Sequence, residues 1–96
     1  MQSIVQEDER CFLCGKNRHA GLEWHHIFGG PNRRLSEEDG LKVLLCADCH
    51  RLGPRSAHKD ASTMHYLHFV GREAYLKTHT PEEFRRRYGR NYEIDT

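Results

Sequence analysis

Four cysteines arranged as two close pairs constrain the fold of this chain more than any other feature. Cys11 and Cys14 form one C-x2-C pair, and Cys46 and Cys49 form the other. Each pair places two thiolates on one tight turn, which suits tetrahedral Zn²⁺ with Zn–S distances of about 2.3 Å. Residues 15–45 separate the pairs, a longer spacing than the roughly 15–20 residues of simple zinc ribbons. We therefore expect a sizeable structural unit between the two pairs.

Two disulfides, or four unrelated thiols, are the alternatives to a metal site. Residues 1–10 lack the positively charged and then apolar order of a signal peptide. Disulfides are rare without export, so this order favours zinc and predicts a cytoplasmic protein. No apolar run reaches the roughly 18 residues that a membrane span needs, so no membrane association is expected. We predict a structural zinc ion whose four cysteine ligands leave no coordination position open for catalysis.

The composition predicts one small domain with a thin apolar core. The chain has 96 residues, of which 36% are hydrophobic, and its mean hydropathy is -0.86. Small scaffolds of this kind usually need a staple such as a metal ion. The net charge of +1 neither favours nor excludes nucleic acid as a partner, but residues 10–59 carry more Lys and Arg than Asp and Glu. Such a local excess suits a phosphate-binding surface, and ordinary solvated surfaces show it too.

The predicted secondary structure is two strands followed by helices. Bulky residues over 22–28 and 41–46 predict short strands, with one helical turn at 36–38 between them. An apolar stripe of core residues predicts a helix over 61–79. A capping box at Thr80 predicts a shorter helix that ends at Gly89. The chain is therefore expected to be a small α+β domain. Its expected parts are a polar arm (1–10), a core (11–59) and a helical extension packed on the core (60–96).

Three histidines near the cysteines are candidates for chemistry. His25 and His26 are neighbours on the first predicted strand, and His50 directly follows Cys49. Adjacent strand residues point to opposite faces, so His25 and His26 cannot serve one metal ion in the same way. The plain alternative is that all three are ordinary strand or surface residues. Four further histidines are interpreted as solvated or packed side chains: His19, His65, His68 and His79.

The order of these residues resembles the zinc-knuckle branch of the HNH endonucleases. The run 23–27, the pair Gly29-Gly30 and the run 45–50 carry the resemblance, which covers about residues 11–58. Residues 83–92 are similar to the endings of small phage-encoded HNH proteins. The resemblance implies a ββα-metal fold, in which two strands and a helix surround one catalytic divalent cation.

The resemblance also implies a role for each histidine. His25 and His50 match metal ligands, and His26 matches the general base. His58 matches a further ligand that some members carry. The implied activity is that of a metal-dependent DNA endonuclease or nickase, with Mg²⁺, Mn²⁺ or a second Zn²⁺ as the catalytic ion. The strandedness of the DNA is open, and a homodimer would cut both strands.

One position departs from the family's pattern. Counted back from His50, the family's middle asparagine falls on Leu41, which cannot make the hydrogen bond that pins the loop between the strands. Asn32 is the nearest candidate substitute. Two alternatives follow: either the loop is held differently, or this chain is impaired as an enzyme. We expect the first, because the histidine positions are intact.

A competing function is a catalytically silent zinc-finger module that binds nucleic acid or a protein. Such a module needs the four cysteines but has no need of a histidine pair and a Cys-His junction. The nuclease hypothesis also needs side chains that contact the DNA phosphates. Arginines near the site are candidates, although an ordinary solvated surface explains them equally well. Four arginines flank the candidate site and are the predicted contacts: Arg33, Arg34, Arg51 and Arg55.

Overall fold

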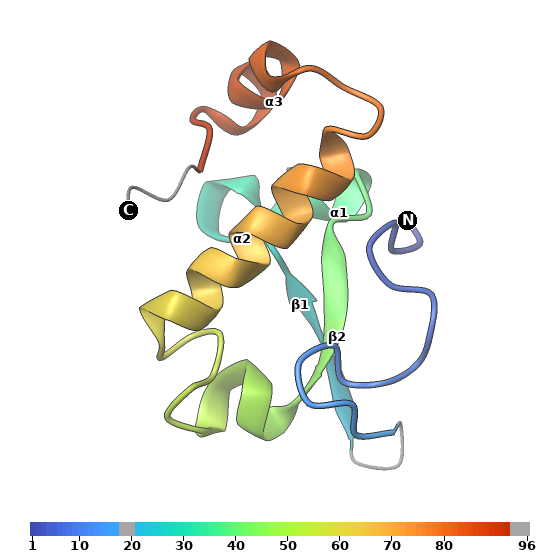
Figure 1. Cartoon of the computed structure of the whole chain (residues 1–96), viewed down its shortest axis with the longest axis vertical. Coiled ribbons are helices and arrows are strands. Elements are labelled where there is room, and N and C mark those ends of the chain that lie inside the picture. The colour runs from blue at the N-terminus through green and yellow to red at the C-terminus, as the bar shows by residue number, and fades with distance from the viewer. Residues whose placement is uncertain (18–20, 93–96) are drawn as a thin grey trace.

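The computed structural model describes residues 1–17 and 21–92, so His19 lies outside the described residues. In this part of the chain, two antiparallel strands form a sheet and helices pack around it (Figure 1), which confirms the predicted α+β class. Strand β1 (Leu22–His26) pairs with β2 (Lys42–Cys46). In this register His25 lies opposite Val43.

The connection between the strands is more helical than predicted. A 3-10 turn, η2 (Gly30–Asn32), leads directly into helix α1 (Arg33–Glu38), where only a turn at 36–38 was expected. Pro31 lies in the first turn of η2, where a proline needs no N–H donor. Strand β1 ends two residues before the predicted boundary at Phe28, because Gly29 and Gly30 turn the chain away from the sheet.

Helix α2 (Ala61–Tyr75) passes in front of the upper end of β1 in Figure 1, and α3 (Pro81–Tyr88) lies beyond its end. At Gly71, a Cβ atom would meet Cγ2 of Ile27 at 2.7 Å, so only glycine permits this close crossing. Helix α2 ends at Tyr75 rather than at the predicted residue 79. The predicted capping box between Thr80 and Glu83 is present at the start of α3.

The core lies between the sheet, α2 and α3. Most of the predicted α2 stripe is buried, but Met64 is 36% exposed because it lies in the first turns of the helix, beside an open cleft. Aromatic rings from three segments pack together around Phe28. The largest fully buried hydrophobic side chains are Phe28, Phe84, Ile27, Leu41, Leu45, Leu67 and Val43.

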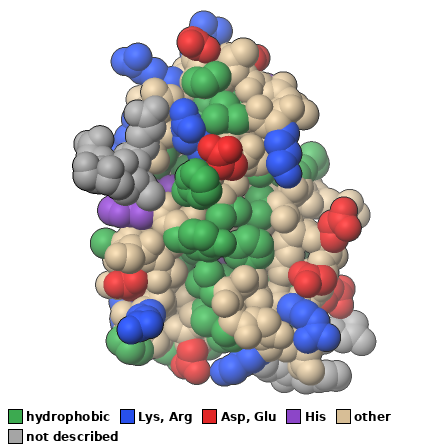
Figure 2. Space-filling model, viewed as in Figure 1, with side chains coloured by type: hydrophobic (Ala, Val, Ile, Leu, Met, Phe, Trp, Pro, Cys, Tyr) green, Lys and Arg blue, Asp and Glu red, His purple; other side chains and the backbone are tan. Residues whose placement is uncertain are grey.

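The N-terminal arm runs beside β2 and contains no helix in residues 1–10. The N–H of Ile4 donates to the carbonyl of Gly40 at 2.9 Å, and the Ser3 hydroxyl donates to the carbonyl of Lys42 at 2.6 Å. Figure 2 shows hydrophobic side chains gathered along the middle of the same face; exposed apolar residues of the chain include Ile4 and Phe69. Within the described residues, every helix is too short or too polar to cross a membrane.

Candidate metal centres and the adjoining cleft

The four cysteines meet at one end of the sheet. Cys46 ends β2, and Cys49 lies in the π-helical turn η3 (Asp48–Leu52) that follows. The four sulfur atoms lie within 4.8 Å of one another. The sulfurs of Cys14 and Cys46 are 3.7 Å apart, close to the roughly 3.8 Å between sulfurs that tetrahedral Zn–S distances produce. All four are free thiols, so the cluster can hold a structural metal ion.

The electrostatics of the cluster favour a cation. Burial opposes ionisation of Cys11, but backbone hydrogen bonds from Cys46, Cys14 and Leu13 lower its pKa to about 6. Burial, together with the other three cysteines, raises the pKa of Cys49 above its ordinary value. Each ionised thiolate therefore makes ionisation of the next thiol less favourable. A bound divalent cation removes this conflict, because it stabilises all the thiolates together.

Three histidines form a second cluster. His25 comes from β1, His50 from η3 and His58 from the loop before α2, and one ring nitrogen from each lies within 4.8 Å of the others. The Nε2 atoms of His50 and His58 are 3.1 Å apart. The His25 ring centroid lies 5.3 Å from each of the other two. The structure thus brings the three predicted ligand positions together.

A tight turn brings His58 back to His50 despite the Gly53-Pro54 interruption between them. The N–H of Gly53 donates to the carbonyl of Asp48 at 2.9 Å, and a Cβ at Gly53 would lie 2.8 Å from that oxygen. Further along, the N–H of His58 donates to the carbonyl of His50 at 3.2 Å. Glycine at position 53 therefore permits the turn that closes the cluster.

The surroundings of the histidine cluster favour neutral imidazole rings. His25 is 7% exposed. Burial, and then the nearby His50 and His58, lower its pKa to about 3. Burial also lowers the pKa of His58. A neutral imidazole keeps the lone pair that a metal ligand needs.

Glu23 orients His50. Its Oε1 lies 2.8 Å from Nδ1 of His50. Hydrogen bonds from Arg51 first, and then from His50, lower the pKa of Glu23 to about 2. Because a carboxylate only accepts, Nδ1 of His50 donates, and Nε2 is left facing His58. Glu23 was not predicted as a site residue, although its position two residues before His25 places both side chains on one face of β1.

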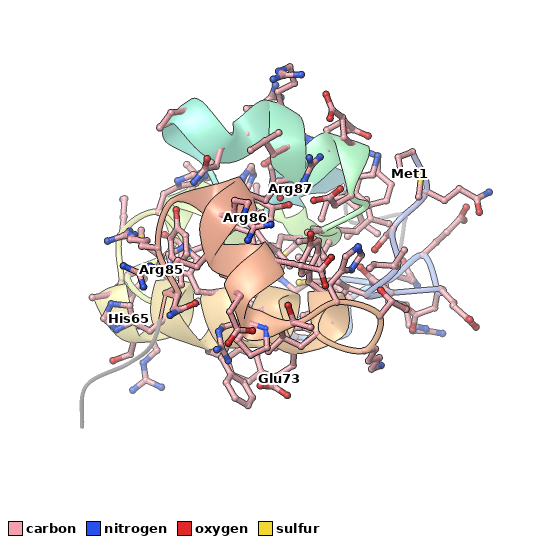
Figure 3. The ribbon with its side chains drawn as sticks, turned by 90° about the horizontal axis from the view of Figure 1, so that it is seen from above. Met1, His65, Glu73, Arg85, Arg86 and Arg87 are labelled. Carbon is pink, nitrogen blue, oxygen red and sulfur yellow. The ribbon has the colours of Figure 1, made fainter. Side chains whose placement is uncertain are left out.

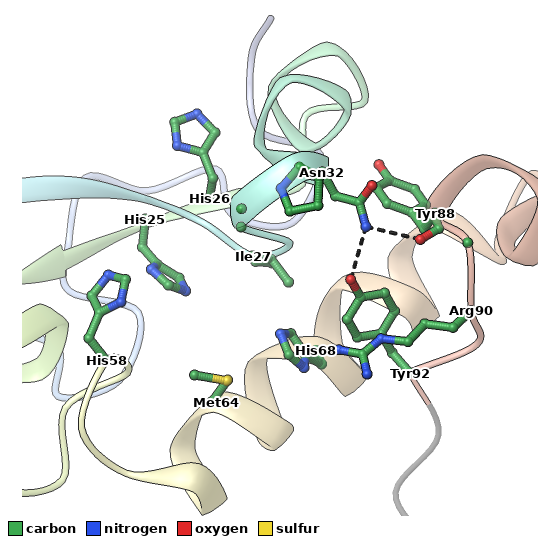
Figure 4. A pocket seen from close by; sticks show the side chains of 14 residues that line it. His25, His26, Ile27, Asn32, His58, Met64, His68, Tyr88, Arg90 and Tyr92 are labelled. Carbon is green, nitrogen blue, oxygen red and sulfur yellow. Dashed lines mark hydrogen bonds between the residues drawn. The ribbon is translucent and has the colours of Figure 1, made fainter.

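His26 has a carboxylate partner of its own. Its Nε2 lies 2.8 Å from Oε1 of Glu37 on α1. Lys42 donates to the other oxygen of Glu37 at 2.8 Å. Figure 4 shows His25 and His26 leaving β1 on opposite sides. Both side chains nevertheless contribute to the lining of one cleft of about 590 Å³, which His58 also lines.

The loop between the strands is pinned by Ser36. Its buried hydroxyl donates to the carbonyl of Leu41 at 2.5 Å and accepts from the N–H of Phe28 at 3.2 Å. Asn32, the predicted substitute, instead donates to the carbonyl of Tyr88 at 2.9 Å and therefore ties η2 to the end of α3. The prediction for Asn32 was wrong, because the loop folds back through α1 and brings Ser36 between its two ends.

The four arginines predicted as phosphate contacts do not line the cleft. Arg51 is paired with Glu23 at 2.9 Å, and Arg34 is paired with Glu38 at 2.7 Å. Arg33 and Arg55 are exposed. The arginine that does line the cleft is Arg90, which follows α3 and carries no local sequence signal.

Comparisons of the chain with known protein families, with curated proteins and with solved structures give no match. The functional conclusion therefore depends on the arrangement of the side chains. A closed set of four sulfur donors suits a structural ion. A cluster of three imidazoles beside an open cleft leaves room for a substrate at a bound ion.

Proposed function

We propose that this chain is a metal-dependent endonuclease or nickase of the HNH kind, which hydrolyses DNA phosphodiester bonds. One observation carries the proposal: His25, His50 and His58 converge beside a cleft that His26 also lines. The residue order that resembles the HNH family supplies the reaction class. The proposal includes a ββα-metal arrangement made of β1, β2 and the segment from η3 onward.

The histidine cluster fits a divalent cation. Its three donors are imidazoles, of which His25 is held neutral by burial, and such a set favours transition metals such as Mn²⁺ or Zn²⁺ over Mg²⁺, although availability can override this preference. When bound, a divalent ion would offset the negative charge that develops on the phosphate and on the leaving 3′ oxygen. Glu23 holds His50 in the orientation that this role requires.

His26 is the proposed general base. Its Nε2 donates to Glu37, so its remaining lone pair lies on Nδ1. In the proposed mechanism, Nδ1 takes a proton from a water molecule, which then attacks the phosphorus in line with the leaving oxygen. Glu37 keeps the proton on Nε2 and stabilises the imidazolium that forms.

The cysteine cluster is the proposed structural zinc site. Cys49 and His50 are neighbours in η3, so an ion held by the cysteines would also fix the backbone that presents His50. In the family, an asparagine at the position of Leu41 pins the loop between the strands. In this chain the Ser36 hydroxyl holds the loop instead, and this supports an intact site.

The test is cleavage of supercoiled plasmid by the purified, zinc-loaded chain with Mg²⁺, Mn²⁺ or EDTA. We expect metal-dependent nicking, at least about 100-fold slower in His26→Ala. The matched control is His65→Ala, which removes an exposed histidine and should cleave normally. Immediate linear product would indicate a homodimer that cuts both strands.

Two results would contradict the proposal. Unchanged cleavage by His26→Ala would remove His26 as the base. Absence of cleavage of both plasmid and single-stranded DNA with every metal, from folded and zinc-loaded protein, would favour the silent zinc-finger module. The second result is decisive only if circular dichroism and metal analysis show that the protein tested is folded and loaded.

A further inference from the structure

The cleft continues well beyond the histidine cluster. His25 and His58 lie at one end, and His68, Arg90 and Tyr92 lie at the other (Figure 4). The far half is built by three segments that are distant in sequence: the turn after β1, the N-terminal half of α2, and the residues after α3. The whole cleft has a volume of about 590 Å³, which falls in the range of sites that enclose small organic groups.

The lining of the far half is apolar and aromatic. Ile27 and Met64 contribute aliphatic surface. The His68 ring stacks on Phe28 with a centroid distance of 5.4 Å and meets the Tyr92 ring edge-on at 4.8 Å. Burial, and then the neighbouring Arg90, lower the pKa of His68 to about 4. At neutral pH the far half therefore offers ring faces and edges without a buried charge.

Among the described residues that line the cleft, Arg90 is the one Lys or Arg. The Arg90 guanidinium lies over the Tyr92 ring, 4.2 Å from its centroid. Arg90 is exposed and makes no ion pair with any residue that the structure describes. A planar guanidinium can stack on a base and pair with a phosphate. These properties of the guanidinium suit a ligand that carries both a base and a phosphate.

Hydrogen bonds from Asn32 hold the segments of the far half together. Asn32 donates both to the carbonyl of Tyr88 and to the hydroxyl of Tyr92, each at 2.9 Å. Tyr92 is held at a φ of 53°, a left-handed conformation that is uncommon for a bulky residue and is concentrated at functional sites. Since both N–H groups of Asn32 are used in this way, its amide nitrogen cannot read the edge of a base.

We propose that the far half of the cleft receives one unpaired nucleobase next to the scissile phosphate, so the substrate is single-stranded nucleic acid or a strand with an extruded nucleotide. This inference rests on the proposed function. A paired base is stacked inside a duplex and cannot enter a concave site. An unpaired base can stack on aromatic rings or on an arginine plane, while the same cation meets the backbone.

The test measures binding without cleavage. Fluorescence anisotropy of the zinc-loaded chain, with no catalytic metal added, compares a labelled DNA strand of about 16 nucleotides with its duplex and with an RNA strand of the same sequence, all at one salt concentration. We expect the single strand to bind at least about tenfold more tightly than the duplex. The RNA arm identifies which single strand the site takes.

Two variants address the far half independently. Gly29 lines the cleft with a φ of -94°, and a Cβ there meets no heavy atom within 4 Å. Both substitutions should therefore be tolerated without backbone strain. Gly29→Trp should fill the cleft, whereas the smaller side chain of Gly29→Ala should leave it open. Arg90→Ala removes the cation. Arg86→Ala is the charge-matched control, because Arg86 lies in α3 and does not line this cleft (Figure 3).

Gly29→Trp and Arg90→Ala should each weaken single-strand binding by about tenfold relative to Gly29→Ala and Arg86→Ala. Equal affinity for single strand and duplex, or unchanged single-strand binding by both variants, would overturn the inference. Metal-dependent plasmid nicking is measured separately. Nicking that is accompanied by either of those two results would leave the nuclease proposal standing and reject only the base site.

Discussion

At the scale of single residues, two carboxylates determine how the candidate site is presented. Glu23 accepts from Nδ1 of His50, and Glu37 contacts Nε2 of His26, both at 2.8 Å. Each contact fixes a ring orientation and a tautomer, and so decides which nitrogen faces the ligand. The two acids are also held by cations, Arg51 and Lys42. Their pKa values of about 2 mean that both remain ionised at any working pH.

We predict that Glu23→Gln weakens binding of Mn²⁺ or Zn²⁺ at the histidine cluster by about 10- to 100-fold. The amide still reaches His50 but carries no charge to raise the basicity of the ring. Titration calorimetry of zinc-loaded protein measures the effect directly. Glu73→Gln is the matched control, since Glu73 lies on α2 and pairs with Arg72. An unchanged affinity in Glu23→Gln would show that His50 needs no orienting partner.

A different result is expected for Glu37→Gln. Metal affinity should be unchanged, because Glu37 does not contact the cluster, whereas the cleavage rate should fall by about 10- to 100-fold as His26 loses the partner that stabilises its charged form. Single-turnover cleavage and metal titration together separate the two roles. Glu38→Gln, which removes a neighbouring charge that pairs with Arg34, should keep its rate. Loss of metal binding in Glu37→Gln would contradict the assignment.

At the scale of elements, the loop between β1 and β2 depends on one hydroxyl. Ser36 joins the N–H of Phe28 to the carbonyl of Leu41 and so closes the loop at its base. The backbone adds a second link, from the N–H of Leu41 to the carbonyl of Ser36 at 2.8 Å. This closure sets where β1 ends, and His25 and His26 occupy the last two positions of that strand.

A comparison of two buried serines tests this role. Ser36 and Ser56 are both 0% exposed, but the Ser56 hydroxyl has no hydrogen-bond partner among the residues that the structure describes. Ser36→Ala removes the partner of the Phe28 N–H and leaves the Leu41 carbonyl with the N–H of Ile27 as a donor, and it should cost about 1–3 kcal/mol, or roughly 4–8 °C in Tm for each kcal/mol. Ser56→Ala should be neutral or slightly stabilising. Equal Tm changes for the two variants, measured by thermal unfolding, would show that the Ser36 hydroxyl does not hold the loop.

Features that depend on local sequence were predictable, and features that depend on tertiary contacts were not. The capping box at Thr80 and the cysteine pairs are encoded within a few residues, and both were predicted. Ser36 carries no signal, because its partners Phe28 and Leu41 become neighbours only when α1 forms. The far half of the cleft was missed for the same reason: Tyr92 reaches it only after α3 folds back onto η2.

At the scale of the whole molecule, the two donor clusters are coupled through one short segment. The turn η3 contributes Cys49 to the sulfur cluster and His50 to the imidazole cluster. The N–H of Phe12, next to Cys11, donates to the carbonyl of Leu44 in β2 at 2.8 Å, so the first cysteine pair is also attached to the sheet. An ion held by the cysteines would therefore stabilise the fold and the candidate site together.

Removal of metal should therefore have two separable effects. We predict that dialysis against EDTA empties the histidine cluster, which adjoins the open cleft, before the cysteine cluster, and leaves one zinc ion per chain and an unchanged Tm. Cys46→Ser should lose that ion and unfold, because binding of a structural zinc is worth about 10–16 kcal/mol in zinc-finger peptides, against a domain stability of about 5–15 kcal/mol. His50→Ala should keep the zinc ion and the fold but lose the second metal. Elemental analysis with circular dichroism distinguishes these cases, and a folded Cys46→Ser protein without zinc would show that the cysteines serve another purpose.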